Sequence, residues 1–419
     1  MTEKQKIFRE KHLNEIKVLA KYYRSELLGN IVPFWEERVV DKEFGGYFNG
    51  FDRYGKLIDD KKPGWFIGRD LYTFAALYNK IEKRPEWLEI AKVGRESMNG
   101  PAYAGNGRFH QMMSRDGRVI SKESSIFTEH FAAKALCEYI KACGKNAKQE
   151  DIDFARILID GIYERTADRN ELRQEGIPDN MQKHAVNFMN LIVALESLPV
   201  FENAYISKLN ESVHNSLFIY ANNDLKVPFE YIGNDGEPVL EGEGRLVDPG
   251  HTLESLWFSM ETGLQKQNPE LITRAGEVLN WVIAHAYDHE YGGFYQHVDF
   301  ETLIPEKRFL LNSYAGTPVA WNDKIWWVQA EALNALAMSA LLNSDEKQFS
   351  YFMEVHNFTK EYFRDQEAPE WFSFLKRDGT VYDTRKGFEL KGPYHVPRTH
   401  MLLTELFEAY VNNELMIPN

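Results

Sequence analysis

The sequence predicts an all-α protein, a closed (α/α)6 barrel with short β-hairpin excursions at one mouth. Three observations lead to this prediction. One local pattern recurs six times, a second amphipathic helix lies between successive copies, and no Ser/Gly/Pro-rich linker interrupts the chain. Each copy starts with an aromatic, strand-like stretch, continues through a tight turn and leads into a long amphipathic helix. We therefore expect residues 1–419 to form a single domain.

The aromatic stretches mark where each copy begins. In chain order they are Gly45-Gly46-Tyr47-Phe48, Gly107-Arg108-Phe109, Glu171-Leu172-Arg173, Phe229-Glu230-Tyr231, Gly292-Gly293-Phe294-Tyr295 and Trp371-Phe372-Ser373-Phe374. The helices that follow them begin near Gly68, Thr128, His184, His251, Trp326 and His395. The third copy is the weakest, whereas the fifth closely repeats the first.

A second set of helical patterns alternates with the first. These patterns span residues 87–98, 151–164, 204–221, 269–286 and 346–364. We expect the first helix of each copy to contribute to an inner wall and the alternate helices to form an outer wall. The pattern from about Lys4 to Leu28 would close the ring. An open solenoid of helix pairs is the competing architecture. The ring is favoured because every copy carries aromatic and charged residues at the same point.

The composition limits the possible partners. The 49 basic and 63 acidic residues give a net charge of −14, which argues against nucleic acid or an anionic membrane as a partner. No run approaches the length of a membrane span, and the charged N-terminus lacks an apolar signal region. Two cysteines, Cys137 and Cys143, argue against a disulfide framework and fit a reducing compartment. We expect a cytoplasmic protein.

One stretch, residues 248–254, combines a helix start with a possible proton-transfer pair. Pro249 and Gly250 break the preceding segment, and a helix is predicted to begin at about His251. His251 and Glu254 are three residues apart and so share a helix face. A histidine beside a carboxylate can transfer protons, although a structural or capping histidine is the alternative.

Aligning the six copies extends this site to a ring of polar residues. The equivalent positions are occupied by Arg69, Glu129, His184, His251, Gln329 and His395, with Glu331 and Arg398 within a turn of theirs. Such a set could hold a proton-transfer site.

Several of these residues have alternatives. Asn187 could take the place of His184 on the third helix. Arg69 could pair with Asp70 or Glu331, or bind an oxyanion. Glu129 is expected to be an internal salt-bridge partner.

Other patterns do not predict sites. His285 and His289 have the spacing of a metal-binding pair, with His297 following, but they lie at the end of an outer helix. No metal site is therefore expected. Phosphate-binding glycine loops and nucleophile motifs are not found in the sequence.

Five segments resemble the N-acylglucosamine 2-epimerase family, in the same order and over nearly the whole chain. They are Gly68-Arg69, Pro249-Gly250-His251-Thr252-Leu253-Glu254, Trp326-Trp327 with Glu331, Glu370-Trp371-Phe372 with Arg377-Asp378-Gly379, and Tyr394-His395-Val396-Pro397-Arg398. The resemblance implies an (α/α)6 barrel and an isomerase that removes and returns the C2 proton of a sugar through an enediolate.

The resemblance also implies residue roles. His251 and His395 would act as acid and base on opposite faces of C2, Glu254 and Glu331 would orient them, and Arg69 would stabilise the enediolate oxygen. The candidate substrate-binding residues are Trp327, Trp371, Arg398, Gln329, His184 and Asn187. No cofactor is expected to be required. ATP as a non-consumed activator and a homodimer are implied by the family.

The identity of the sugar stays open at this point. The segments around His251 and His395 resemble the N-acyl branch, which favours interconversion of N-acetylglucosamine and N-acetylmannosamine. Residues 327–331 look more like the cellobiose branch, so epimerisation of mannose or cellobiose and aldose–ketose isomerisation are alternatives. A glycoside hydrolase using Glu129, Glu254 or Glu331, or a non-catalytic sugar- or protein-binding barrel, would represent other classes.

Overall fold

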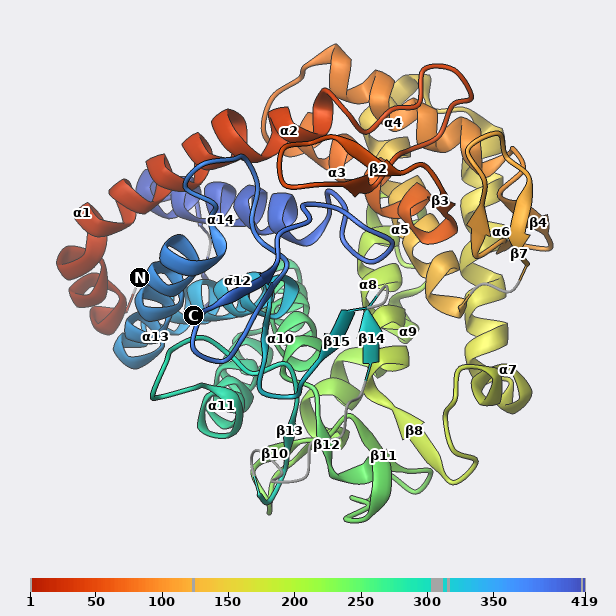
Figure 1. Cartoon of the computed structure of the whole chain (residues 1–419). Helices are drawn as coiled ribbons and strands as arrows, with labels where there is room; N and C mark the ends of the chain where they lie inside the picture. Colours follow the sequence, from red (N-terminus) through yellow and green to blue (C-terminus); the bar gives the residue numbers. More distant parts are fainter. Residues whose placement is uncertain (1, 123–124, 303–311, 315–316, 416, 419) are drawn as a thin grey trace.

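The computed structural model describes residues 2–122, 125–302, 312–314, 317–415 and 417–418. Within these residues, six helices form a closed inner ring (Figure 1). They are α3 (Gly64–Lys80), α5 (Ile126–Cys143), α8 (His184–Phe201), α10 (Pro249–Gln265), α12 (Trp326–Asn343) and α14 (His395–Asn412). Each contacts the next in chain order, and α14 contacts α3, which closes the ring.

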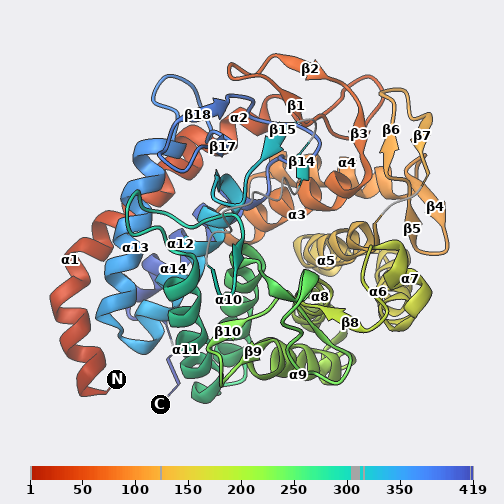
Figure 2. The ribbon, with the colours of Figure 1, turned by 60° about the horizontal axis from the view of Figure 1, so that its bottom comes forward.

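Six outer helices surround the ring in the described part of the chain. They are α1 (Glu3–Glu26), α4 (Pro85–Met98), α6 (Gln149–Ala167), α9 (Ile206–His214), α11 (Pro269–Ala286) and α13 (Glu346–Phe358). Five of them pack against the inner helix that precedes them, and α1 packs against α14. The first and last helices of the chain therefore lie side by side (Figure 2). The predicted (α/α)6 barrel is confirmed, and the open solenoid is excluded.

Short helical segments extend or connect these helices. The α-helical segments are α2 (Val32–Glu36) and α7 (Arg169–Gln174), the π-helical turns are η1 (Leu27–Ile31), η3 (Asn215–Ile219) and η5 (Thr359–Phe363), and the 3₁₀ turns are η2 (Gly144–Asn146) and η4 (Gly242–Arg245). The π turns directly continue α1, α9 and α13. They explain why the sequence patterns at residues 4–28, 204–221 and 346–364 run past the ends of the α-helices.

Short strands form a collar at the N-terminal end of the inner helices. They are β1 (Gly50–Phe51), β2 (Leu57–Asp59), β3 (Lys62–Pro63), β4 (Tyr103–Gly105), β5 (Arg108–Phe109), β6 (Met112–Met113), β7 (Val119–Ser121), β8 (Met181–Lys183), β9 (Ala221–Asn222), β10 (Val227–Pro228), β11 (Tyr231–Gly233), β12 (Leu246–Val247), β13 (Val298–Asp299), β14 (Asn312–Tyr314), β15 (Thr317–Val319), β16 (Lys324–Ile325), β17 (Phe374–Leu375) and β18 (Val381–Asp383). Strands β3, β8 and β16 run directly into α3, α8 and α12.

The strands connect neighbouring copies as well as forming the expected hairpins. Pairs such as β1–β2, β6–β7 and β17–β18 are hairpins within one copy. In contrast, β3 pairs with β6, β8 with β11, β12 with β13, and β16 with β17, each across a boundary between copies. These four pairings hold the collar together around the mouth, because each one joins a repeat to the next by hydrogen bonds.

Three buried ion clusters reinforce the collar. Each contains an aspartate whose side chain is fully buried, a lysine from the same copy and an arginine from the next copy. The clusters are Asp41 with Lys62 and Arg115, Asp288 with Lys324 and Arg377, and Asp365 with Lys386 and Arg53. In the third cluster, Asp365 and Lys386 belong to the sixth copy and Arg53 belongs to the first copy. The 2.7 Å pair between Arg53 and Asp365 therefore joins the two ends of the repeat array.

The paired glycines next to two of these aspartates have a conformational role. Gly45 and Gly46 have φ values of 70° and 73°, and Gly292 and Gly293 have φ values of 80° and 70°. Glycine adopts this left-handed conformation more easily than any other residue, because it has no Cβ atom. This requirement explains why the Gly-Gly-aromatic pattern of the first copy returns in the fifth.

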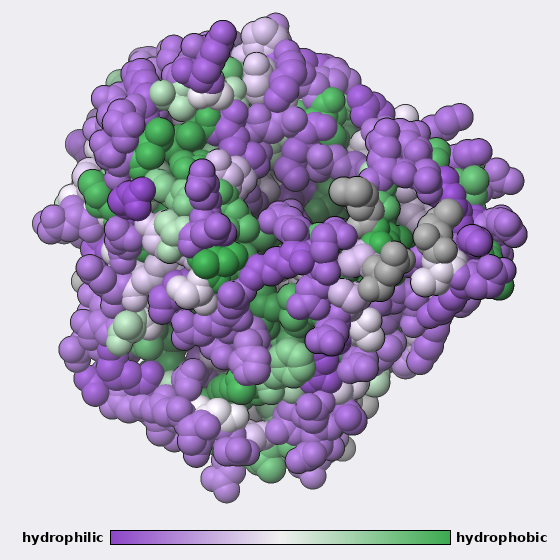
Figure 3. All heavy atoms as spheres, turned by 180° about the vertical axis from the view of Figure 1, so that it is seen from behind, coloured by the Kyte–Doolittle hydropathy of each residue, from purple (hydrophilic) through white to green (hydrophobic). Residues whose placement is uncertain are grey.

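Helix α8 differs from one sequence-based expectation. By length and composition it is apolar enough to cross a membrane, whereas no such segment was expected. Most of the helix is buried in the inner wall, which accounts for its apolar composition. The face of the molecule opposite to Figure 1 is covered mainly by hydrophilic residues, with smaller hydrophobic patches between them (Figure 3).

The ring-closing cluster gives a testable prediction for stability. Asp365→Asn leaves Lys386, whose side chain is fully buried, without its carboxylate. Removing one partner of a buried ion pair costs about 3–5 kcal/mol, so urea unfolding at pH 7 should show a loss of that size. Glu37→Gln, which removes the exposed partner of Arg38, should change the unfolding free energy by less than about 0.5 kcal/mol. Equal losses in both variants would contradict a special role for Asp365.

The same variant should differ from the wild type in its dependence on pH. Burial raises the pKa of Asp365, but hydrogen bonds from Arg53, a backbone amide and Lys386 outweigh it and hold the pKa below its usual value. A depressed pKa contributes stability above the unfolded-state value of about 3.9 and loses it as pH falls through the folded value. The gap between wild type and Asp365→Asn should therefore narrow below about pH 4, and a constant gap would contradict this assignment.

Candidate active site

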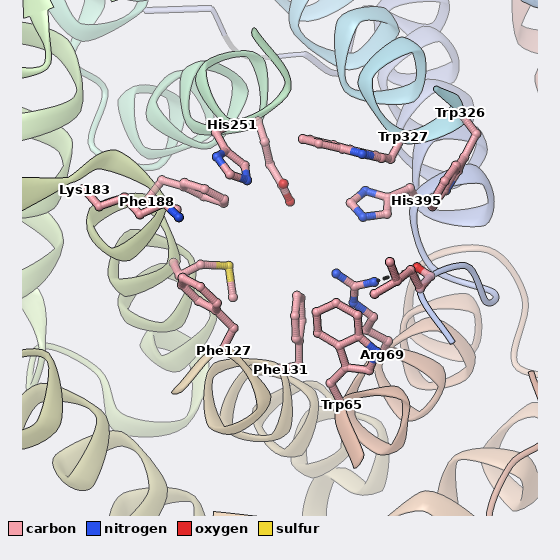
Figure 4. Close-up of a pocket in the computed structure, with 14 residues that line it drawn as sticks. Trp65, Arg69, Phe127, Phe131, Lys183, Phe188, His251, Trp326, Trp327 and His395 are labelled. Carbon is pink, nitrogen blue, oxygen red and sulfur yellow. Dashed lines mark hydrogen bonds between the residues drawn. The ribbon is translucent and has the colours of Figure 1, made fainter. Parts of the chain in front are cut away.

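The inner ring surrounds a cavity of about 180 Å³ to which all six inner helices contribute (Figure 4). Its lining residues are Trp65, Arg69, Phe127, Phe131, Lys183, Ala185, Phe188, Met189, His251, Glu254, Trp326, Trp327, Leu390 and His395. The labelled side chains in Figure 4 point toward one space, with Trp327 between His251 and His395. The walls are largely aromatic and carry a few polar groups, which is typical of a small-molecule site.

His251 is fixed at the N-terminus of α10 by Asp248. The Asp248 side chain accepts a hydrogen bond from the backbone amide of His251 at 3.0 Å and caps the helix, with Pro249 in the first turn. Asp248 also contacts His251 Nδ1 at 3.2 Å and His297 Nε2 at 3.1 Å. His297, which follows the predicted histidine pair in the sequence, thus belongs to the support of this site.

A second carboxylate, Glu230, holds the same nitrogen of His251. Its Oε2 lies 3.2 Å from Nδ1, and its side chain is 1% exposed. Burial opposes the charged imidazolium, but the negative charges of Asp248 and Glu230 outweigh it and raise the pKa of His251 to about 9. His251 is therefore protonated at neutral pH. Because Nδ1 faces the carboxylates, Nε2 is the nitrogen on the cavity side.

The predicted pairing of His251 with Glu254 is wrong. Glu254 lines the cavity, but its Oε1 accepts a hydrogen bond from Arg398 at 2.6 Å. Sequence spacing places both residues on one helix face, yet the charges that reach His251 come from the helix cap and from the loop before β11.

Trp327 separates the two histidines. Its ring centroid lies 5.5 Å from that of His251 and 5.7 Å from that of His395. A Cβ atom at Gly250 would lie 2.2 Å from the Trp327 ring, so glycine is required for α10 to approach this wall. The glycine of the Pro-Gly-His motif therefore positions both the tryptophan and the first histidine.

His395, the first residue of α14, has the opposite electrostatic environment. Its Nδ1 lies 2.8 Å from Glu331 Oε1, which acts as the acceptor and assigns the proton to Nδ1. Burial and the positive charges of Arg398 and Arg69 keep the pKa of His395 well below 6.5. The imidazole is therefore neutral at pH 7, and its Nε2 lone pair is available on the cavity side.

Arg398 connects the residues under the floor of the cavity. Its side chain is 3% exposed and donates hydrogen bonds to Glu254 at 2.6 Å, to Glu331 at 2.7 Å and to the Tyr394 hydroxyl at 2.7 Å. Trp257 donates a further hydrogen bond to Glu331 at 2.8 Å. Glu331 is thus held in place from several sides behind His395.

Arg69 presents a guanidinium that forms no ion pair with a described carboxylate. It lies between the rings of Trp65 and Phe131, with its central carbon 4.4 and 4.2 Å from their centroids. Among the described residues, the guanidinium donates a single weak hydrogen bond, of 3.4 Å, to the Leu390 carbonyl. Burial lowers its pKa to about 10, so it is still charged at neutral pH.

The two alternative partners of Arg69 are engaged elsewhere. Asp70 accepts a hydrogen bond from Asn49, and Glu331 binds Arg398 and His395. The Arg69 guanidinium is therefore available to an anionic oxygen in the cavity.

Five of the six predicted substrate-binding residues do not line the cavity, which corrects the expectation. Gln329 binds the backbone of Phe294 at 2.7 and 2.8 Å, and Trp371 is buried against Phe363 and His400. His184 and Asn187 both contact Ser216, on the side of α8 away from the cavity. Arg398 lies beneath the cavity floor and does not line the cavity.

The rotation of each helix explains these differences. Aligning the first residue of each helix does not fix which side chains face inward, because successive residues turn by about 100°. On α8 the inward positions belong to Ala185, Phe188 and Met189, and the preceding Lys183 also lines the cavity. Glu129, in contrast, is an internal salt-bridge partner as expected, 3.7 Å from Arg165.

Two groups of donor atoms have the spacing of a metal site. They are Glu230, Asp248 and His251, and Glu254, Glu331 and His395. In the first group the imidazolium of His251 offsets the carboxylate charge, and in the second the Arg398 guanidinium occupies the space between the carboxylates. Both groups are thus already organised around a cationic side chain.

Sequence reasoning missed several residues of the site. From the sequence, Glu230 is expected only as part of an aromatic stretch, and Asp248 only as part of a helix start. A signal for Asp248 exists, because an N-cap aspartate three residues before a histidine lies close to it. For Glu230 and the aromatic residues Trp65, Phe127 and Phe131, we find no signal in the single sequence.

A barrel with two histidines of opposite environment around one cavity defines a protein class suited to proton transfer. Residues 46–397 match the N-acylglucosamine 2-epimerase (GlcNAc 2-epimerase) family, and the chain belongs to it.

Relatives agree with this assignment, and a solved structure shares the fold. The chain is 29% identical to N-acylglucosamine 2-epimerase of Mus musculus over 96% of this chain and 94% of that protein. It is 23% identical to cellobiose 2-epimerase of Bacteroides fragilis over 90% of this chain and 96% of that protein. The structure of cellobiose 2-epimerase from Spirochaeta thermophila has a TM-score of 0.77 at 19% identity and covers 94% of this chain and 98% of that chain.

The charge around His251 can be tested by titration. In ¹⁵N-resolved NMR spectra, His251 should titrate at about pH 9, identified by the signal that is lost in His251→Asn. Glu230→Gln removes a negative charge that stabilises the imidazolium, so the pKa should fall by about one unit or more. Glu237→Gln, on the exposed turn after β11, is the control and should leave the pKa unchanged. An unchanged pKa in Glu230→Gln would refute the ion pair.

Proposed function

We propose that this protein is a sugar 2-epimerase that interconverts N-acetylglucosamine and N-acetylmannosamine. The observation that carries the proposal is the pair of histidines on either side of Trp327, one protonated and one neutral at pH 7. Two environments that push the pKa values of neighbouring groups apart define an acid and a base.

The reaction requires the open-chain aldehyde form of the sugar. A histidine removes the C2 proton, and the electron pair moves to the C1 oxygen to give an enolate, which is an enediolate for a 2-hydroxy sugar. Arg69 binds the C1 oxygen and offsets its charge. The other histidine then donates a proton to the opposite face of C2, and the carbonyl at C1 reforms with inverted configuration at C2.

The resting charges assign the first roles. His395 is neutral and accepts the proton on Nε2, while Glu331 holds Nδ1–H and favours the imidazolium that forms. His251 is charged and donates from Nε2. After one turnover the protonation states are exchanged. The reverse reaction therefore starts from the less populated state, or follows proton exchange with solvent.

The choice of an N-acyl sugar rests on two supports. The similarity to the mouse N-acylglucosamine 2-epimerase is higher than that to the cellobiose enzyme, at 29% against 23% identity. The wall formed by Phe127, Phe188 and Met189 is apolar, and an N-acetyl methyl group gains free energy when it is buried there. A sugar with a hydroxyl at C2 lacks this gain.

The hydrolase alternative has less support. Retaining and inverting glycosidases use two carboxyl groups that flank the scissile bond across an open site. Here Glu254 and Glu331 share the Arg398 guanidinium, and Glu331 is fully buried. Glu129 is also buried and lies near Arg165.

Activation, assembly and location complete the proposal. Among the described residues, the basic side chains that line the cavity are Arg69, Lys183 and the two histidines. The rest of the lining is largely aromatic and apolar, so the cavity does not fit a triphosphate. Activation by ATP, which the N-acyl branch implies, therefore requires a site outside this cavity, and rates measured with and without ATP test it.

We also propose a homodimer and a cytoplasmic location, which sedimentation and cell fractionation test.

Deuterium incorporation tests the proposed reaction. In D₂O, N-acetylmannosamine should form N-acetylglucosamine that carries deuterium at C2, because the histidine that donates to the opposite face has exchanged its proton with solvent. Mannose and cellobiose are assayed in parallel, and product separation distinguishes epimers from ketoses. Uptake into mannose or cellobiose alone would overturn the substrate assignment. No uptake into any of the three sugars would overturn the epimerase.

The role of Arg69 predicts a loss that is concentrated in the chemical step. Arg69→Met keeps much of the side-chain volume between Trp65 and Phe131 but removes the charge. The loss of one donor to a developing oxyanion costs about 10²–10³ in kcat, with a smaller change in KM. Arg115→Met, which lies in the collar, should keep kcat within about threefold. A change in KM alone would show that Arg69 only binds the ground state.

A further inference from the structure

A lysine with no role in the proposed reaction lies buried under the cavity. Lys134 on α5 is 0% exposed and forms no ion pair with a described carboxylate. Its ammonium lies 3.8 Å from the centre of the Tyr72 ring and donates a hydrogen bond of 2.9 Å to the Tyr394 hydroxyl. A buried cation without a counter-ion is costly and requires an explanation.

Lys134 is joined to His395 by a continuous chain of contacts. The Tyr394 hydroxyl accepts hydrogen bonds from both Lys134 and Arg398, at 2.9 and 2.7 Å. Arg398 donates to Glu331 at 2.7 Å, and Glu331 lies 2.8 Å from His395 Nδ1. With both tyrosine lone pairs engaged, the position of Tyr394 depends on the two cations at once.

Five inner helices contribute charged or titratable groups that interact with this ammonium in the described part of the chain. These groups are Tyr72 on α3, Glu138 on α5, Glu196 on α8, Glu254 on α10, and His395 and Arg398 on α14, with Tyr394 at its cap. Burial and the charge of Arg398 lower the pKa of Lys134 to about 7, while Glu196, Glu254 and Glu138 oppose the shift. The ammonium also lowers the pKa of His395 by direct repulsion.

We propose that Lys134 is a positioning residue of the epimerisation: through Tyr394 and Arg398 it fixes Glu331 behind His395, and its charge keeps the cavity-facing nitrogen of His395 free to accept the C2 proton. This inference rests on the proposed two-histidine reaction. Lys134 does not line the cavity and so acts through the floor. Because the Lys134 ammonium has a pKa of about 7, it also makes the rate of epimerisation depend on the titration of a second group near neutral pH.

The pH profile of Lys134→Met tests the proposal. Methionine has a similar length but no charge, so the imidazolium of His395 becomes easier to form. The acid limb of kcat/KM should move to higher pH by about half a unit to one unit, with kcat at pH 7 lowered more than KM is changed. Lys134→Arg keeps the charge and should retain the acid limb of the wild type.

Histidine titration separates the proposal from the proposed function. In NMR spectra without sugar, the pKa of His395 should rise in Lys134→Met and stay low in Lys134→Arg. Lys62→Met is the matched control, because it removes a buried ammonium from the collar, and it should lower thermal stability without moving either profile. If wild-type protein exchanges no C2 proton of any sugar, the proposed function fails, whereas an unchanged His395 titration in folded Lys134→Met overturns the role of Lys134.

Discussion

The cavity depends on the hydrogen bonds and ion pairs that the Arg398 guanidinium forms beneath it. The guanidinium binds two carboxylates, Glu254 and Glu331, and the Tyr394 hydroxyl, and it is almost completely buried. Without it, two negative charges would remain inside the barrel with no direct cation, at a cost of several kcal/mol. Because Glu331 is fixed in this way, the ring of His395 has one tautomer and one orientation.

The two histidines differ because the charges around them have opposite signs. Near His395 the surplus is positive, from Arg398 and Arg69, so the neutral ring is favoured. Near His251 the surplus is negative, from Asp248 and Glu230, so the imidazolium is favoured. In the proposed reaction, identical side chains therefore start as base and acid, and the overall charge of −14 does not predict either environment.

The fold could be predicted from the sequence because it is built from repeats. The site was harder to predict because its residues differ from one repeat to the next. Six aromatic stretches and alternating helices predicted the ring, and the Gly-Gly pairs marked its turns. The sequence could not reveal that Arg53 and Asp365 join its ends. His251, His395 and Arg69 were found by alignment of the copies and by family resemblance. His184, Asn187 and Gln329 were misplaced, since a helix start leaves the rotation of the inward face undetermined.

Exchange by the single-histidine variants tests the account most directly, because two bases on opposite faces of C2 each recognise one epimer. Incubated in D₂O, His395→Asn should exchange the C2 proton of one N-acetylhexosamine epimer, and His251→Asn that of the other. Neither variant should interconvert the epimers at an appreciable rate. Exchange of both epimers by either variant would contradict the two-base account, because one histidine would then serve both faces.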